Sequence, residues 1–184
     1  MKSNELEKFL DLNTDHYFKK TKHIILKNKD MQVTYAVFMR RPVLFCPSLA
    51  IKWLRKIEKI RNTKFNIKMC YKEGEWVGAG EPLMFLSGKF SQLVELETTY
   101  LQLIGPASVA AYNAFKMCTD LPNTAFMAMD ARHCAGAYMH ELMAYGASVG
   151  SNKAKKEVNA KGFIGSSCKS TSYFFKSDHA LGTM

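Results

Sequence analysis

The sequence predicts an α/β protein, with an α+β sandwich domain followed by the first strands of an incomplete α/β barrel. Apolar residues occupy every second position from Met31 to Met39, which is the period of a half-buried strand. They recur at three-to-four spacing from Ser48 to Arg61, as in a helix with one buried face. After the loop Asp120–Asn123 the order becomes strand, helix, strand, helix, which is typical of a parallel sheet covered by helices.

The first domain is predicted over residues 1–121. A short helix is expected over 5–12, and a second helix whose buried face comprises Tyr17, Phe18, Thr21, Ile24 and Ile25. The strands are expected at 31–39, 65–70 and 83–86, around the helix 48–61. Helical spacing returns over 91–104 and 109–117. Gly105 and Pro106 between them predict a kink or two abutting helices, because proline lacks a backbone donor.

The second domain is predicted over residues 122–184. We expect strands at 124–130 and 162–165, helices at 135–146 and 167–175, and a further strand from 179. Arg132 and His133 follow the first of these strands, and Gly165, Ser166 and Ser167 lie at the end of the second. Because α/β folds bind ligands beyond the carboxyl ends of parallel strands, we expect a ligand site there.

The net charge of +10 does not by itself indicate a nucleic-acid partner. Only five of the 26 basic residues are Arg, and the Lys excess is typical of solvated surface charge. A basic surface also suits an enzyme of phosphorylated small molecules. The five cysteines include no Cys-x-x-Cys pair and the five histidines show no metal-ligand spacing, so neither a disulfide framework nor a metal site is predicted.

No apolar run approaches the ~20 residues that a membrane-spanning helix needs. The first residues also lack the apolar core of a secretory signal. We therefore expect a cytoplasmic protein with no membrane partner.

Short motifs occur in order along most of the chain, and together they resemble a known family. They are Thr14–Phe18, Gly74–Leu83, Glu97–Thr98, Arg132–His133, Gly165–Ser167 and Gly182–Met184. At these positions the chain resembles the nicotinate phosphoribosyltransferases, which are type II phosphoribosyltransferases related to the quinolinate enzymes. The resemblance implies transfer of ribose 5-phosphate from phosphoribosyl pyrophosphate to nicotinate, giving nicotinate mononucleotide for NAD biosynthesis. It also implies Mg²⁺ with phosphoribosyl pyrophosphate, ATP as a co-substrate, and a homodimer.

Two other functions stay open at this point. Quinolinate phosphoribosyl transfer with decarboxylation would need more cations around Arg132 for the second carboxylate, and Lys153, Lys155 and Lys156 are weak candidates. A remnant that only dimerises or binds a small molecule is the third possibility. The family's chains continue for roughly as long again, and their phosphorylated histidine is expected two residues beyond Met184. We therefore expect an amino-terminal fragment with no catalytic residue of its own and no turnover.

The planar guanidinium of Arg132 suits a bidentate clamp on the nicotinate carboxylate. The alternative is an ion pair with Asp130 or a cap on a helix end. His133 is expected to orient Arg132 or to contact substrate, unless it is a structural histidine.

The backbone N–H groups of Gly165, Ser166 and Ser167 are expected to bind phosphate, although the serines could simply cap the next helix. The resemblance also assigns Thr183 to substrate binding. It implies that Tyr17 stacks on nicotinate, in the site of a neighbouring subunit. The alternative for Tyr17 is an ordinary core aromatic.

Overall fold

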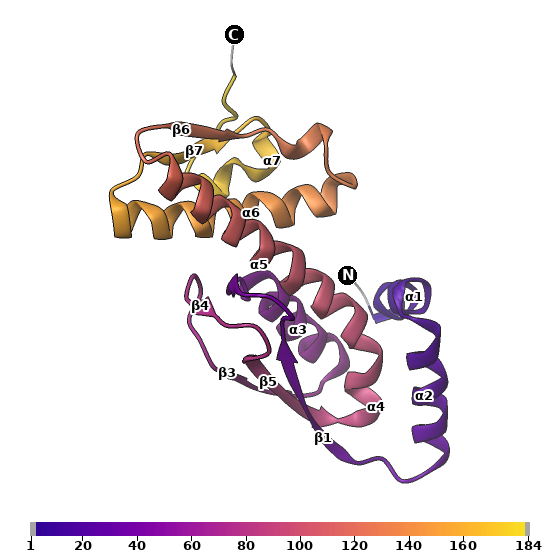
Figure 1. Ribbon diagram of the computed structural model, residues 1–184. Helices are drawn as coiled ribbons and strands as arrows, with labels where there is room; N and C mark the ends of the chain where they lie inside the picture. Colours follow the sequence, from indigo (N-terminus) through magenta and orange to yellow (C-terminus); the bar gives the residue numbers. More distant parts are fainter. Residues whose placement is uncertain (1–2, 183–184) are drawn as a thin grey trace. The chain divides into compact units, whose positions relative to one another are not determined.

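The computed structural model describes residues 3–182, which form two compact units (Figure 1). The first unit contains the chain up to Arg41, Pro47–Tyr71 and Ala79–Ile104, and the second contains Pro42–Cys46, Lys72–Gly78 and the chain from Gly105. The protein is 56% helical and 18% strand, so the predicted mixture of helix and sheet is confirmed. The predicted boundary at 121/122 lies inside the second unit. Compact units and family domains divide a chain by different criteria, so that boundary stays a prediction.

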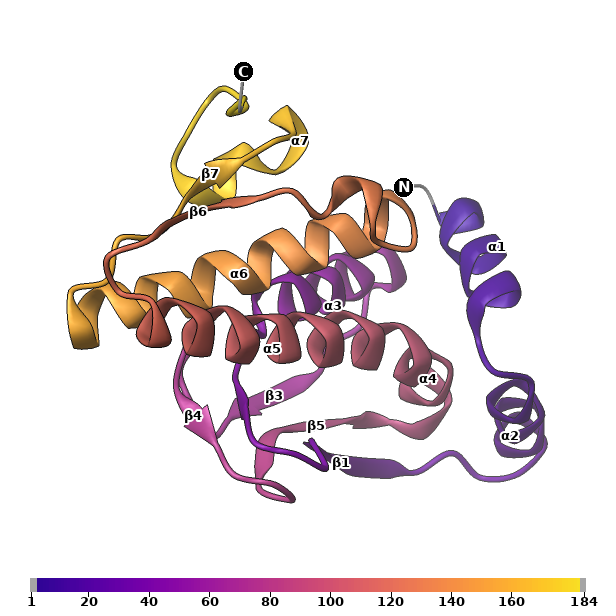
Figure 2. The same ribbon diagram turned by 45° about the horizontal axis from the view of Figure 1, so that its top comes forward.

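The first unit is built on a three-stranded antiparallel sheet in the order β1 (Gln32–Phe38), β5 (Pro82–Lys89), β3 (Asn66–Met69). Every second residue of β1 is less exposed than its neighbours, as the alternation predicted. Helix α3 (Ser48–Arg61) lies over this sheet (Figure 2) and buries Leu54 and Ile57 completely. The sheet and α3 therefore enclose the core of this unit.

Helix α2 (His16–Lys27) follows α1 (Ser3–Asn13) and packs with a narrower face than predicted. Phe18 and Ile25 form a buried cluster with Val94, which lies in the 3₁₀ turn η1 (Val94–Leu96) that follows α4 (Phe90–Leu93). Tyr17 is 59% exposed and Ile24 is 61% exposed, so the prediction that both belong to the buried face is wrong. Because Phe18 and Ile25 lie two turns apart, they form a single stripe, and the residues beside that stripe face away from the cluster.

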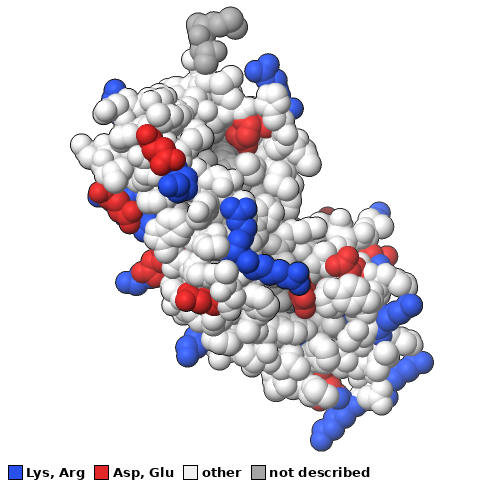
Figure 3. All heavy atoms as spheres, in the orientation of Figure 1, with Lys and Arg blue, Asp and Glu red and all other residues white. Residues whose placement is uncertain are grey.

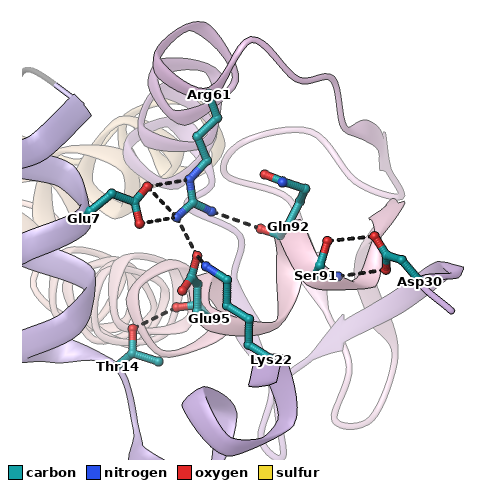
Figure 4. Close-up of polar contacts among 8 residues, drawn as sticks. All are labelled: Glu7, Thr14, Lys22, Asp30, Arg61, Ser91, Gln92 and Glu95. Carbon is teal, nitrogen blue, oxygen red and sulfur yellow. Dashed lines mark hydrogen bonds and ion pairs between the residues drawn. The ribbon is translucent and has the colours of Figure 1, made fainter. Parts of the chain in front are cut away.

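A buried ion network joins these helices to α3 (Figure 4). Arg61 and Glu95 have 9% exposed side chains, and Arg61 Nη2 lies 2.5 Å from Glu95 Oε1. Lys22 of α2 contacts the same carboxylate oxygen, while Glu7 of α1 accepts hydrogen bonds from the Arg61 guanidinium. The Thr14 hydroxyl donates to the Glu95 carbonyl. The network thus fixes α1 and α2, and with them the backbone that carries Tyr17.

Helix α5 (Glu97–Asp120) runs through Pro106 as one helix, so the alternative of two abutting helices is wrong. Proline removes one backbone hydrogen bond. Ile104, Ala107 and Ser108 around it are all buried completely. The packing of these side chains offsets the lost bond.

The second unit contains a parallel βαβ arrangement of β6 (Ala125–Ala128), α6 (Gly136–Val158) and β7 (Gly162–Ser166). This unit also contains a short antiparallel pair, β2 (Val43–Leu44) and β4 (Trp76–Val77), which was not predicted from the sequence. Helix α6 ends at Val158 rather than at the predicted 146. Beyond β7 lie α7 (Lys169–Ser172) and the 3₁₀ turn η3 (Tyr173–Phe175), and residues 179–182 form no strand, contrary to the prediction.

None of the helices within residues 3–182 combines the length and the apolar character needed to cross a membrane. On the face drawn in Figure 3, Lys and Arg side chains are interspersed with Asp and Glu. This mixed pattern agrees with the interpretation of the Lys excess as solvated surface charge.

Candidate active site

The two segments predicted to bind ligand begin at the same edge of the parallel pair. Ala128 is the register partner of Ser166, so β6 and β7 reach their carboxyl ends side by side. The Ser167 N–H donates to the Ala128 carbonyl at 2.9 Å, which ties the two strand ends together. This edge is where an α/β fold places a ligand site, and the structure therefore brings Arg132, His133 and Gly165–Ser167 into one region of the second unit.

Arg132 lies at the end of the 3₁₀ turn η2 (Asp130–Arg132), and its side chain is exposed. The alternative of an ion pair with Asp130 is not what the structure has, because the Asp130 carboxylate contacts His140 Nδ1 at 3.0 Å. None of the ion pairs found within residues 3–182 includes Arg132. Its guanidinium is thus accessible to an anionic ligand.

His133 is exposed and follows directly, with its backbone N–H donating to the Asp130 carbonyl at 2.9 Å. The histidine that is buried and satisfied in this region is His140, which is 6% exposed. The structural role that was the alternative for His133 is therefore filled by His140. His133 lies on the solvent side of the turn beside Arg132.

The loop after β7 uses much of its hydrogen-bonding capacity within the protein. Ser166 is completely buried, and its hydroxyl pairs with Thr171 Oγ1 at 2.7 Å and accepts the Cys168 N–H at 3.2 Å. The Ser167 N–H donates to the Ala128 carbonyl. The helix that follows, α7, has only four residues. A Cβ on Gly165 would lie 2.4 Å from the side chain of Leu181. The residue that precedes α7 is Cys168, and no side chain caps this helix, so the structure does not have the serines as a helix cap. Phosphate binding by the loop stays a prediction.

A buried series of hydrogen-bonded polar side chains lies beneath this edge, and the sequence did not predict it. His140 Nδ1 contacts Asp130, and its Nε2 contacts Thr171 Oγ1 at 3.0 Å, which in turn pairs with Ser166. These side chains connect η2, α6, α7 and the end of β7. Neither periodicity nor a spacing rule predicts such contacts, because they depend on how the helix crosses between the strands.

Tyr17 belongs to the first unit, where its exposed ring contradicts the core alternative. Partial desolvation raises the pKa of the Tyr17 hydroxyl, and the negative charges of Asp15 and Glu97 raise it further. An exposed ring on a helix held by the ion network is available for stacking. Thr183 lies outside the described residues.

An apolar cavity of about 280 Å³ lies between α5, α6 and β6 in the second unit. Its lining includes four methionines, Met117, Met127, Met129 and Met143, and reaches Asp130. Neither Arg132 nor the loop after β7 contributes to its lining, so we assign it no ligand.

The comparison with protein-family models matches residues 15–108 to the quinolinate phosphoribosyl transferase N-terminal domain. This range covers the part of the chain from Asp15 to the middle of α5. No curated protein sequence matches the chain.

Several solved structures share the fold. A nicotinate-nucleotide pyrophosphorylase from Pyrococcus furiosus matches 93% of this chain with a TM-score of 0.66 and 21% identity. Human nicotinic acid phosphoribosyltransferase also matches 93%, with a TM-score of 0.67 and 18% identity. A nicotinate-nucleotide pyrophosphorylase from Ehrlichia chaffeensis matches 80%, with a TM-score of 0.60 and 18% identity. The chain spans 41%, 39% and 52% of these three proteins, respectively.

Proposed function

The chain belongs to the family of quinolinate phosphoribosyl transferase N-terminal domains, and on this premise we propose that it serves phosphoribosyl transfer to a pyridine carboxylate in NAD biosynthesis. The observation that carries the proposal is the exposed Arg132 at the shared carboxyl edge of β6 and β7. Its guanidinium presents parallel donors that match a carboxylate.

We propose nicotinate as the acceptor. Ribose 5-phosphate moves from phosphoribosyl pyrophosphate to the ring nitrogen, and nicotinate mononucleotide and pyrophosphate are the products. Positive charge builds at the anomeric carbon as pyrophosphate leaves, so the protein contributes mainly positioning of the two substrates. Arg132 holds the carboxylate, His133 lies beside it, and Tyr17 stacks on the ring in a homodimer. Gly165–Ser167 and Thr183 are proposed to contact the phosphates.

Quinolinate is the second candidate, because the matching family model is named for it. Its additional carboxylate calls for a second cation near Arg132. Lys153 pairs with Glu157 at 2.8 Å, and Lys155 donates to the Phe163 carbonyl at 2.9 Å. Both lie toward the end of α6, about 26 and 29 Å along the helix from Gly136 at 1.5 Å per residue. Lys169, exposed just after β7, is a better placed cation for this alternative.

Mg²⁺ is expected to accompany phosphoribosyl pyrophosphate, and the described residues do not fit it as ligands. Mg²⁺ prefers six oxygen ligands. The cluster of potential ligands within residues 3–182 is Asp130, Cys134 and His140, and two of its three ligand atoms are sulfur and nitrogen, which suit softer metals than Mg²⁺. We therefore derive no step through this ion. We likewise propose ATP as a co-substrate and derive no step through it.

The reaction is tested in an enzyme extended to the length of the relatives, with radiolabelled nicotinate and phosphoribosyl pyrophosphate and with unlabelled quinolinate as competitor. We expect labelled nicotinate mononucleotide to form and excess quinolinate to leave its rate nearly unchanged. Strong competition, together with carbon dioxide release from quinolinate, would instead assign the quinolinate reaction. No product from either acid in this extended enzyme would refute both proposals.

A further inference from the structure

Three side chains with different ligand atoms converge where α6 begins. The ligand atoms of Asp130, Cys134 and His140 all lie within 4.8 Å of one another, and Asp130 Oδ2 lies 3.0 Å from His140 Nδ1. A tetrahedral zinc ion has oxygen and nitrogen ligands at about 2.0–2.2 Å and sulfur at about 2.3 Å, which places neighbouring ligand atoms about 3.3–3.7 Å apart. The Asp130–His140 separation is already close to that spacing, and the separations from Cys134 exceed it by about 1 Å at most.

The backbone holds this arrangement in a short, hydrogen-bonded turn. The N–H groups of His133 and Cys134 both donate to the Asp130 carbonyl, at 2.9 and 3.0 Å. The Gly136 N–H donates to the Cys134 carbonyl at 2.9 Å, and Gly136 has φ of +84°, which a glycine adopts without strain. His140 follows one helical turn into α6. The three ligands therefore come from one preorganised segment.

The second nitrogen of His140 is already oriented by a buried partner. Nε2 lies 3.0 Å from the hydroxyl of Thr171, which is 1% exposed and also contacts Ser166 Oγ and the Cys168 carbonyl. A histidine that binds metal through Nδ1 carries its proton on Nε2 and usually donates it to an oxygen acceptor. Thr171 can accept that proton's hydrogen bond and donate its own to Cys168. This contact fixes the ring with Nδ1 toward Asp130.

We propose that Asp130, Cys134 and His140 bind one Zn²⁺ ion. A thiolate and an imidazole suit zinc and cobalt rather than magnesium or calcium. One carboxylate and one thiolate neutralise the dication, so no net positive charge is added beside Arg132. Three protein ligands leave the fourth position for water or a small ligand. The half-buried Cys134 and the 21% exposed Asp130 side chain leave a route from solvent.

The bound ion would link η2, which carries Arg132, to the first turns of α6. It would thereby hold the backbone of Arg132 without touching substrate. The proposal rests on the cluster alone and is independent of the proposed transferase activity.

Cobalt provides the test, because a cobalt–thiolate bond absorbs in the near ultraviolet. The metal-free 184-residue chain is titrated with Co²⁺, and we expect one ion per chain, a charge-transfer band, and its loss when Zn²⁺ is added. Cys134→Ser should abolish the band. Cys168→Ser is the matched control, since Cys168 is also half-buried in the second unit but lies outside the cluster. This control should keep the band unchanged.

Thr171→Val separates a metal site from a simple hydrogen-bonded cluster. It removes the partner of Nε2 but no ligand, so it should weaken Zn²⁺ binding about 10–100-fold while retaining the band. Circular dichroism checks that each variant is folded. A wild-type chain without a stoichiometric band, or a band that survives in Cys134→Ser, overturns the proposal.

Discussion

Gly150 of α6 faces the carbonyl oxygen of Ala111 in α5 so closely that a Cβ atom on Gly150 would lie 2.1 Å from it. Gly146, one turn earlier, meets the Ala107 carbonyl in the same way, at 2.3 Å. The two glycines therefore let the helix backbones of the second unit touch. This contact positions α6, and with it the edge that carries Arg132.

Gly150→Ala should destabilise the protein, because the added methyl group forces two backbones apart. We expect the free energy of unfolding in urea to fall by about 1–3 kcal/mol. Gly105→Ala is the matched control, since a Cβ there meets nothing within 4 Å in the same α5 helix. It should stabilise the protein by about 0.5–1 kcal/mol. Equal effects of the two substitutions would refute the close approach.

Arg61→Ala should be among the most destabilising substitutions in the first unit. It leaves the carboxylate of Glu95, with a 9% exposed side chain, with Lys22 as its remaining partner and removes the partner of Glu7. Breaking a buried ion pair costs about 3–5 kcal/mol. The control is Lys116→Ala, because Lys116 and Asp120 form an exposed pair at 3.5 Å, and its loss should cost less than about 1 kcal/mol. Urea unfolding of both variants measures the difference, and similar values would contradict the network's role.

Ser91 should make the stability depend on pH through Asp30. The Ser91 hydroxyl donates to Asp30 Oδ2 at 2.7 Å and lowers the pKa of that carboxyl (Figure 4). A lowered folded-state pKa contributes stability above the unfolded pKa of about 3.9, and this contribution is lost as the pH falls through the folded value. Ser91→Ala should therefore destabilise more at neutral pH than in acid.

Ser87→Ala is the control for that titration, because Ser87 pairs with the hydroxyl of Thr34, a neutral group. Its effect should not change with pH over the same range. A Ser91→Ala effect that is equally flat, with the Asp30 pKa unchanged by NMR, would rule out the coupling.

The sequence was sufficient for elements whose packing follows a simple period. The alternation in 31–39 located β1 and its buried side, and the apolar spacing in 48–61 located α3 with the observed bounds. The ends of β6 and β7 were also predicted closely enough to place Arg132 and Ser167 at one edge. In these cases local pattern and tertiary burial agree.

The sequence was insufficient where contacts depend on backbone approach or distant partners. The end of α6 was missed because Gly146 and Gly150 pack through their backbones and so leave no apolar pattern. The predicted buried face of α2 was too wide. Which residues beside Phe18 are buried depends on the segment that packs against α2, here the one that contains Val94, and the helix's own sequence does not reveal it. His140 was missed because its partners, Asp130 and Thr171, lie in different elements.

Tyr17→Ala should leave the fold intact and impair substrate use. Tyr17 is 59% exposed, so we expect the free energy of unfolding to change by less than about 0.5 kcal/mol. Tyr100, which is 2% exposed in the same unit, is the control, and its replacement by Ala should cost about 3–5 kcal/mol. The KM for nicotinate should rise in Tyr17→Ala only.

If Tyr17 completes the site of a neighbouring subunit, mixed dimers should recover activity. Combining Tyr17→Ala subunits with Arg132→Ala subunits leaves one site with both residues intact. We expect part of the activity to return after subunit exchange. No recovery despite proven exchange would assign Tyr17 to its own subunit's site.

The most direct test of the proposed clamp is the effect of Arg132→Ala on kcat/KM for nicotinate compared with nicotinamide, measured in the extended enzyme. Loss of a bidentate contact to a desolvated carboxylate should cost about 2–5 kcal/mol of transition-state binding with nicotinate. Any activity with nicotinamide, which has no carboxylate, should hardly change. Arg40→Ala, an exposed arginine of the first unit, should affect neither substrate. Equal losses with both substrates would contradict the clamp and reassign Arg132 to phosphate binding or to structure.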